Sequence, residues 1–269
     1  MLFNVYRKGI IHMKFQLKIG RPDKADYILL GFVLLLLIFI VYFYFFSNKR
    51  EPFDNSRESL NKNIDAVYYI NLSHRKDRQN EFLDNFSEKD AKRMKRIQAH
   101  YYPENGAVGC LMSHISALNI AWKENLGENI LICEDDFYIK DMNYLNKMLD
   151  LFFENIQKWD VVMLGQNTSQ SKETGIQTES NEKVIKILDS QTASGYVIKR
   201  AYIPVLLQIY ERDMMEYLRT NEWGNFYTDQ SWKVLQRTDN WYSFLPSVGV
   251  QRKSRSEEHT SELQSRQYL

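Results

Sequence analysis

The sequence is short of cysteine and of net charge, and each shortage excludes a class of protein. Cys110 and Cys133 are its two cysteines, and two cannot by themselves build a disulfide framework or a four-ligand zinc site. Both lie in apolar runs, which predicts small buried side chains rather than redox-active ones. The formal net charge is +1, so nothing marks the whole chain as a nucleic-acid binder. Its 269 residues suffice for one good-sized domain plus accessories.

Charge is also absent from residues 27–46, an apolar run near the N-terminus. Its length matches the ~20 apolar residues that cross a bilayer. The run is longer than the apolar part of a cleaved signal peptide, and no small-residue cleavage site follows it. A buried core helix is the alternative, but that helix would be apolar on every face. The run therefore predicts one transmembrane anchor.

The cations that flank this run predict its orientation. More of them precede it than follow it, which favours a cytoplasmic N-terminus. We therefore expect a cytoplasmic tail (1–26), the anchor (27–46) and a polar stem (47–63). In this single-pass type II arrangement the main domain is lumenal, in the ER or Golgi, or in an equivalent place. The cations before the run are Arg7, Lys8, Lys14, Lys18, Arg21 and Lys24, and those after it are Lys49, Arg50, Arg57 and Lys62.

The C-terminal residues differ from the rest of the chain. Residues 255–265 read RSEEHTSELQS, which looks like the literal translation of a standard short-read sequencing adapter. A genuine polar tail is the alternative. We interpret residues 255–269 as a sequencing artefact, so no functional argument uses them.

Short apolar runs alternate with amphipathic stretches from residue 65 onward. Strands alternating with helices are typical of an α/β layered domain with a largely parallel sheet, in which ligands bind at the carboxyl ends of strands. Residues 166–181 are polar and poor in glycine, and we interpret them as a mobile acceptor loop. The expected strands are 65–72, 130–133, 159–164, 183–188 and 194–198, and the expected helices are 75–86, 107–122, 144–156 and 201–218.

Three consecutive acids, Glu134, Asp135 and Asp136, directly follow the apolar strand 130–133. Carboxylates packed together repel one another unless a cation lies among them. Hard oxygen ligands suit Mn²⁺ or Mg²⁺, and such an ion can bridge to the phosphates of a substrate. A solvated acidic turn is the alternative interpretation.

Basic residues follow the first expected strand, where Arg75, Lys76 and Arg78 surround the start of a helix. Helix N-termini attract anions and the guanidinium fork matches phosphate oxygens, so a nucleoside diphosphate suits this place. A solvated basic helix face is the alternative. Asn71 or Ser73 can equally be a plain cap for that helix.

Two further residues have two interpretations each. His114 ends the segment GAVGCLMSH, where it can contact a donor or be a satisfied structural histidine. Asp229 lies in YTDQSW, and a carboxylate among aromatic rings suits the general base of a sugar-binding cleft. A helix cap is the alternative for Asp229.

Taken in order, these segments resemble glycosyltransferase family 25, which includes bacterial lipopolysaccharide galactosyltransferases and procollagen galactosyltransferases. The resemblance covers residues 64–254, nearly the whole expected soluble part. The segments that carry it are YYINLSHRKDR, Arg96 with Ile97 and Ala99, GAVGCLMSHISAL, LICEDD, SGYVI, Asp229 with Trp232, and FLPSVGVQ.

The resemblance implies a Rossmann-like α/β domain of the GT-A type, a nucleotide-sugar donor, usually UDP-linked, and inversion at the anomeric carbon. Asp136 and Glu134 would hold Mn²⁺ or Mg²⁺, because alternate side chains of an extended strand end share one face. Asp229 would be the base, about 6–10 Å from the acids by analogy with inverting glycosidases. The residues expected to contact the donor are Arg75, Arg78, Asn71, His114 and Asp135.

The sequence therefore predicts a metal-dependent, membrane-anchored glycosyltransferase. It would move a hexose such as galactose from a UDP-sugar to a glycan, lipopolysaccharide or glycoprotein acceptor. The alternative is a non-catalytic, membrane-anchored glycan-binding protein on a degenerate transferase fold. The intact acidic cluster argues against that alternative.

Overall fold

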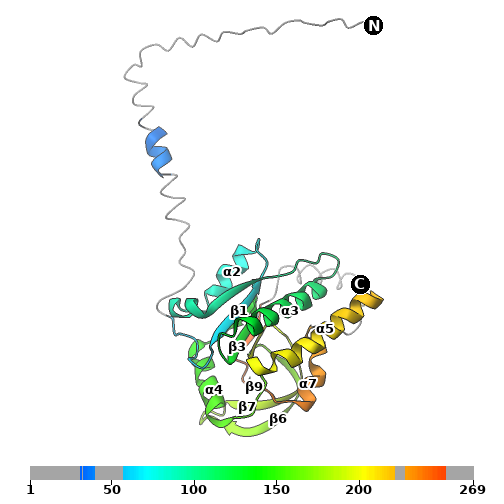
Figure 1. The fold of residues 1–269 in the computed structure, drawn as a ribbon. Helices are drawn as coiled ribbons and strands as arrows, with labels where there is room; N and C mark the ends of the chain where they lie inside the picture. Colours follow the sequence, from blue (N-terminus) through cyan, green and yellow to red (C-terminus); the bar gives the residue numbers. More distant parts are fainter. Residues whose placement is uncertain (1–30, 32, 40–56, 222–227, 253–269) are drawn as a thin grey trace, which may run out of the picture. The chain divides into compact units, whose positions relative to one another are not determined.

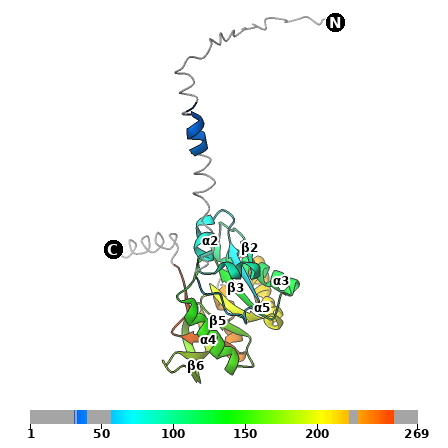
Figure 2. The ribbon, with the colours of Figure 1, turned by 90° about the vertical axis from the view of Figure 1, so that its left-hand side faces the viewer.

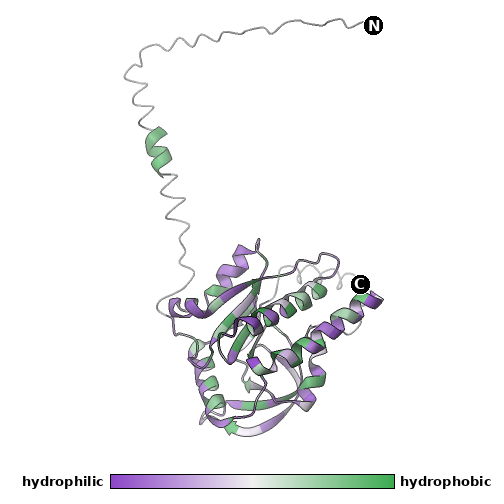
Figure 3. Ribbon diagram, viewed as in Figure 1, coloured by the Kyte–Doolittle hydropathy of each residue, from purple (hydrophilic) through white to green (hydrophobic). Residues whose placement is uncertain are grey.

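The computed structural model describes residues 31, 33–39, 57–221 and 228–252, and the chain divides into two compact units, Met1–Glu51 and Pro52–Leu269. In the first unit the described residues are helical, exposed and apolar (Figure 3). No helix in the described part of the chain is both long enough and apolar enough to span a membrane. The predicted anchor lies mostly outside the described residues, and the predicted tails 1–26 and 255–269 lie wholly outside them.

The second unit is built on an eight-stranded sheet with the strand order β2-β1-β3-β8-β5-β9-β7-β6 (Figure 1). The predicted α/β class is confirmed, but the sheet is mixed rather than largely parallel. Strand β1 pairs in parallel with β2 and β3, and β5 pairs in parallel with β9. The other pairings are antiparallel, because β8 runs between β3 and β5 in the opposite direction and β7 and β6 close the sheet as a hairpin. The strands are β1 (Ala66–Asn71), β2 (Met94–Gln98), β3 (Asn129–Glu134), β5 (Val161–Met163), β6 (Asn167–Gln177), β7 (Lys183–Gln191), β8 (Gly195–Lys199) and β9 (Trp241–Leu245).

Helices cover both faces of this sheet (Figure 2). Along β1 successive side chains point to opposite faces, so Val67 and Tyr69 join one core and Tyr68 and Ile70 the other. The first core includes side chains of α2 and α4, and the second includes side chains of α3 and α5. The helices are α2 (Lys76–Leu83), α3 (Gly106–Glu124), α4 (Met142–Asn155), α5 (Ile203–Thr220), α6 (Thr228–Ser231) and α7 (Lys233–Thr238), with 3-10 turns η1 (Glu88–Arg93) and η2 (Arg200–Tyr202).

A second, two-stranded sheet lies beside the end of β3. It joins β4 (Phe137–Ile139) to β10 (Gly249–Gln251) in antiparallel register, with Gln251 opposite Phe137. This pairing brings the last described residues of the chain against the acidic segment, although more than a hundred residues separate them in sequence.

The interpretation of residues 166–181 as a mobile loop was wrong. Residues 167–177 form β6, which pairs with β7 along the edge of the main sheet. Most side chains of β6 are exposed, so the strand lacks the alternation of apolar and polar residues that marks a half-buried strand. Its register also shifts in several places.

Part of the predicted stem packs on the folded unit. Leu60 is buried, and its backbone N–H donates to the carboxylate of Asp90. The Ser59 hydroxyl forms a hydrogen bond with that of Ser87. The described part of the stem, residues 57–63, is therefore continuous with the folded unit.

Candidate active site

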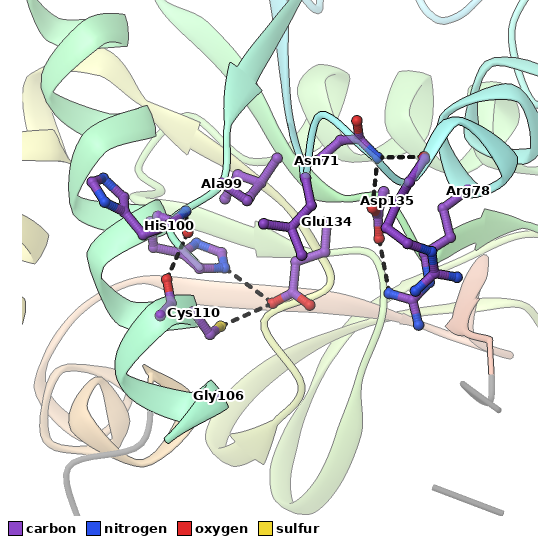
Figure 4. Close-up of a pocket in the computed structure, with 14 residues that line it drawn as sticks. Asn71, Arg78, Ala99, His100, Gly106, Cys110, Glu134 and Asp135 are labelled. Carbon is purple, nitrogen blue, oxygen red and sulfur yellow. Dashed lines mark hydrogen bonds and ion pairs between the residues drawn. The ribbon is translucent and has the colours of Figure 1, made fainter. Parts of the chain in front are cut away.

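The strand order creates a site at the carboxyl ends of β1 and β3. After β1 the chain first adds β2 on one side and then β3 on the other, which is the topological switch where α/β sheets bind ligands. A cavity of about 220 Å³ lies at this point (Figure 4). It is lined by residues of β1, α2, α3 and β3, including Asn71 and Glu134, the last residues of the two strands.

Two of the three acids point to opposite sides of the sheet, Glu134 as the last residue of β3 and Asp135 from the turn that follows it. Glu134 follows Ile132 onto the α3 side, where its Oε1 lies 3.1 Å from His114 Nε2 and 3.4 Å from Cys110 Sγ. Asp135 turns toward α2. It accepts hydrogen bonds from the Arg78 guanidinium at 3.0 Å and from the Asn71 amide at 2.8 Å.

Asp136 occupies a third environment. Residues 135–136 form a turn, so the extended geometry assumed for Glu134 and Asp136 ends at Glu134. Asp136 is buried, and its Oδ2 lies 3.3 Å from Gln251 Nε2 and 3.7 Å from the Arg78 guanidinium. Its Oδ1 is buried without a hydrogen-bond partner among the described residues. The predicted metal role of Asp136 and Glu134 remains a prediction.

Burial and the contacts of each acid shift the pKa values of the three carboxyl groups differently. Burial, reinforced by the charge of Glu134, raises the pKa of Asp136 to about 7. Burial also raises the pKa of Asp135, although Asn71 and Arg78 oppose the shift. For Glu134, burial disfavours the charged form, but the contacts with His114 and Cys110 and the charge of Arg78 together outweigh this effect and lower its pKa. The cluster as folded is therefore short of positive charge around Asp136.

The two arginines beside the cavity, Arg75 and Arg78, form ion pairs with different partners. Arg78 reaches across to the acids and contacts both Asp135 and Asp136. Arg75 lines the same cavity but forms an ion pair with its neighbour Asp77 at 2.7 Å. Its guanidinium lowers the pKa of Asp77 to about 2. Asn71 is buried and also donates to the Arg75 carbonyl, which fixes the turn between β1 and α2.

His114 is fully buried yet borders the cavity. Its Nδ1 lies 3.1 Å from the Tyr196 hydroxyl, and the two rings stack with centroids 5.9 Å apart. Both ring nitrogens therefore have partners, which agrees with a satisfied histidine and also places one nitrogen at Glu134.

Gly109 is needed for packing, because a Cβ there would lie 2.7 Å from the His100 carbonyl oxygen.

Asp229 lies on α6 outside the residues that line the cavity. Its Oδ2 accepts the backbone N–H of Thr192 at 3.0 Å. The preceding residue, Thr228, has its hydroxyl 3.5 Å from Cys110 Sγ, and Cys110 in turn contacts Glu134. Asp229 therefore belongs to the same side of the domain as Glu134. Its role as a base remains a prediction.

Sequence reasoning missed several residues that position these groups. Gln251 contacts Asp136 only because β10 pairs with β4, and no local sequence pattern predicts that pairing. Phe137 packs against glycines from separate segments. A Cβ at Gly195 would lie 2.7 Å from its ring, and Gly249 leaves still less room. The segment SGYVI contains Gly195, but nothing local in it predicts the contact with Phe137.

Comparison with known proteins gives one strong result. Residues 64–218, more than half of the chain, match the model of glycosyltransferase family 25 (LPS biosynthesis protein). No curated protein matches the chain.

Several solved structures are weakly similar. One is a glycosyltransferase involved in the glycosylation of the major capsid of PBCV-1, with 10% identity, a TM-score of 0.41, and coverage of 73% of this chain and 98% of that one. A second is a mannose-1-phosphate geranyltransferase from Thermus thermophilus, with 11% identity, a TM-score of 0.35, and coverage of 65% and 57%. A third is mouse xyloside xylosyltransferase 1, with 6% identity, a TM-score of 0.34, and coverage of 65% and 71%.

These TM-scores are too low for the likenesses to carry an argument, so the assignment rests on the family model. That match confirms the resemblance drawn from the motifs, and the chain belongs to glycosyltransferase family 25 and is a glycosyltransferase.

Proposed function

We propose that this enzyme transfers a hexose, galactose or a similar sugar, from a UDP-sugar to a glycan, lipopolysaccharide or glycoprotein acceptor. The reaction is metal-dependent and inverts the anomeric carbon. The observation that carries the proposal is the cavity at the carboxyl ends of β1 and β3, where two arginines meet two acids. Phosphates suit the arginines, and a divalent cation suits carboxylates. Glu134 and Asp135 line the cavity, and Asp136, the next residue in the chain, is buried and is not part of the lining.

The donor side of the cavity is built by the turn between β1 and α2. Arg75 and Arg78 border it, and Asn71 holds the turn in place through the Arg75 carbonyl. In the unliganded protein Arg78 is paired with Asp135, so a diphosphate competes with that carboxylate for the guanidinium. Asp135 and His114 complete the donor-binding set.

The residues present fit a divalent cation. Asp136 has a buried carboxylate oxygen without a partner among the described residues, and its pKa is raised to about 7 because burial and Glu134 disfavour its charge. Asp136, with Glu134 beside it, would hold Mn²⁺ or Mg²⁺. That ion would neutralise the charge that develops on the departing nucleoside diphosphate.

Inversion places the base opposite the leaving group, so it cannot belong to the metal cluster. Asp229 takes this role in our proposal. The position of α6 supports this role. Thr228, which precedes Asp229 in α6, contacts Cys110, and Cys110 contacts Glu134. Thr192 donates to Oδ2 of Asp229, and the acceptor hydroxyl would be deprotonated by Oδ1, which lies 3.5 Å from Gln230 Nε2.

The topology is part of the same proposal. The uncharged run 27–46 would anchor the enzyme as a single-pass type II membrane protein with a lumenal catalytic domain. The support is the sequence pattern and the excess of cations before the run.

A donor screen tests the proposed activity. The full chain in detergent is incubated with UDP-sugars, GDP-mannose and CMP-sialic acid, each with Mn²⁺ or EDTA, and nucleotide release is measured. We expect release from a UDP-hexose only with the metal, and no release from the Asp136→Asn variant. Release that persists in EDTA contradicts metal dependence. Binding of UDP without release from any donor, with or without glycan acceptors, would favour the non-catalytic alternative.

A further inference from the structure

A cysteine, a histidine and a glutamate converge at the floor of the cavity. Cys110 and His114 lie one helical turn apart on α3, and both contact Glu134 at the end of β3. Figure 4 shows Cys110 beside Glu134. One ligand atom from each residue lies within 4.8 Å of the other two. We infer that these three side chains form a second metal site, for a zinc ion, which shares Glu134 with the Mn²⁺ or Mg²⁺ site proposed at Asp136.

The distances from Glu134 to the other two ligand atoms are close to those of tetrahedral zinc. Zinc binds sulfur at about 2.3 Å and nitrogen or oxygen at about 2.0–2.2 Å, which puts neighbouring ligand atoms about 3.3–3.6 Å apart. Glu134 Oε1 lies 3.1 Å from His114 Nε2 and 3.4 Å from Cys110 Sγ. The third pair of ligand atoms, from Cys110 and His114, lies within 4.8 Å.

The type of ligand selects the metal. Mg²⁺ and Mn²⁺ favour oxygen ligands, whereas a thiolate and an imidazole with one carboxylate suit zinc. A thiolate, a carboxylate and a neutral imidazole balance the two charges of Zn²⁺. Binding breaks the S–H bond of Cys110, forms a Zn–S bond and releases the thiol proton to solvent.

A further contact orients the histidine for this role. Metal-bound histidines almost always use their other ring nitrogen to hydrogen-bond a fixed partner. His114 Nδ1 lies 3.1 Å from the Tyr196 hydroxyl, and both rings are fully buried. The Tyr196 hydroxyl thus directs Nε2 of His114 toward Glu134.

Three protein ligands leave one coordination position for water or a ligand, as in zinc sites that take part in chemistry. All three residues line the cavity, so that position is within reach of a bound donor. The site goes beyond the proposed sugar transfer, because neither a zinc ion nor the Cys110 thiol plays a part in that proposal.

Zinc content and cobalt spectroscopy test the inference on the full chain. Purified protein is dialysed against metal-free buffer, its zinc is measured by mass spectrometry, and Co²⁺ is then added in place of zinc. We expect about one zinc per chain. We also expect an intense near-ultraviolet thiolate-to-cobalt band that Cys110→Ser abolishes. Tyr196→Phe should weaken zinc binding about 10–100-fold.

Two control variants separate this site from its surroundings. Cys133→Ala removes the other cysteine, which is buried in the opposite core, and should keep the band. Asp136→Asn should lose Mn²⁺-dependent UDP binding yet keep zinc and the cobalt band, so failure of either proposal is distinguishable. Circular dichroism verifies the fold of each variant. A wild-type protein without zinc and without the cobalt band overturns the inference, and so does a band that survives Cys110→Ser.

Discussion

The two ends of the main sheet differ in how they are built. Near one end, next to the edge strand β2, β1 is buried along its whole length and pairs in parallel on both sides, and its last residue lines the cavity. At the other end, β6 is mostly exposed and pairs in antiparallel fashion with β7 alone. Figure 1 shows β6 on the far side of the domain from α2 and α3.

This difference shows where the chemistry can lie. Parallel strands end together, so the polar residues that follow β1 and β3 meet at one edge. The hairpin of β6 and β7 instead places its polar residues along an exposed edge, where they contact each other, as in the Lys183–Glu173 ion pair. Carboxylates near β1 are buried and share one arginine, whereas Glu173 is open to solvent.

The largest expected effect follows from removing a charge at the parallel end. Asp136→Asn should lower kcat/KM by about 1,000-fold or more, because the charge that holds the metal at the leaving diphosphate is lost. Glu173→Gln removes the same charge from β6 and should leave kcat/KM unchanged. Steady-state kinetics on both variants checks this. Equal losses at the two ends would contradict the contrast between them.

The next effect concerns the base. Asp229→Asn should lower kcat by about 100-fold or more while leaving the Kd for UDP unchanged, because general-base catalysis contributes on that scale. Asparagine keeps an oxygen that can accept the Thr192 N–H, so the fold is preserved. Calorimetry with UDP and turnover measurements separate binding from catalysis. Near-normal turnover would show that Asp229 is only a cap.

A packing change near the acids should act on stability. Gly195→Ala places a methyl group 2.7 Å from the Phe137 ring, and such overpacking costs about 1–3 kcal/mol in the free energy of unfolding. Gly106→Ala is the matched control. It has no neighbouring atom within 4 Å of the added Cβ, so its stability should change by less than about 0.5 kcal/mol. Urea unfolding measures both, and equal stabilities would contradict the tight packing of Phe137.

The pH dependence of stability should reveal the charge on Asp136. Its folded pKa of about 7 exceeds the ordinary value of 3.8, so the folded state binds the proton more tightly than the unfolded state. In EDTA the wild type therefore loses stability relative to Asp136→Asn as pH rises from about 4 to 7, by at most about 1.4 kcal/mol per pH unit. Above pH 7 the difference levels off. Urea unfolding across this range checks it, and a difference that stays constant would mean an unshifted carboxylate.

Local patterns predicted much of the parallel end. The apolar run of β3 followed by Glu134 identified both a strand and a polar strand end, because burial and chemistry are adjacent in the sequence. The helix that carries His114 was also predicted, since its apolar residues recur at helical spacing.

Features that depend on distant pairings could not be predicted. Gln251 reaches Asp136 through β10, and β6 is a strand because β7 offers it a partner. The turn at residues 135–136 was missed for a related reason. An extended strand end was assumed for Asp136, whereas β4 and β10 redirect the chain. Both cysteines were expected to be buried, which is right for Cys133, but Cys110 is only half-buried where it lines the cavity, and its contact with Glu134 needs the α3–β3 packing.

Thermal unfolding of the full chain with UDP, measured with Mn²⁺ and again with EDTA, tests the central claim most directly. A UDP concentration about 100-fold above Kd should stabilise the metal-loaded enzyme by about 2.7 kcal/mol, which raises Tm by about 5–10 °C. In EDTA the same nucleotide should raise Tm far less, because the acids then repel the diphosphate. An equal rise in Tm in both buffers, or no rise in either, would contradict a metal-dependent UDP-sugar site at the ends of β1 and β3.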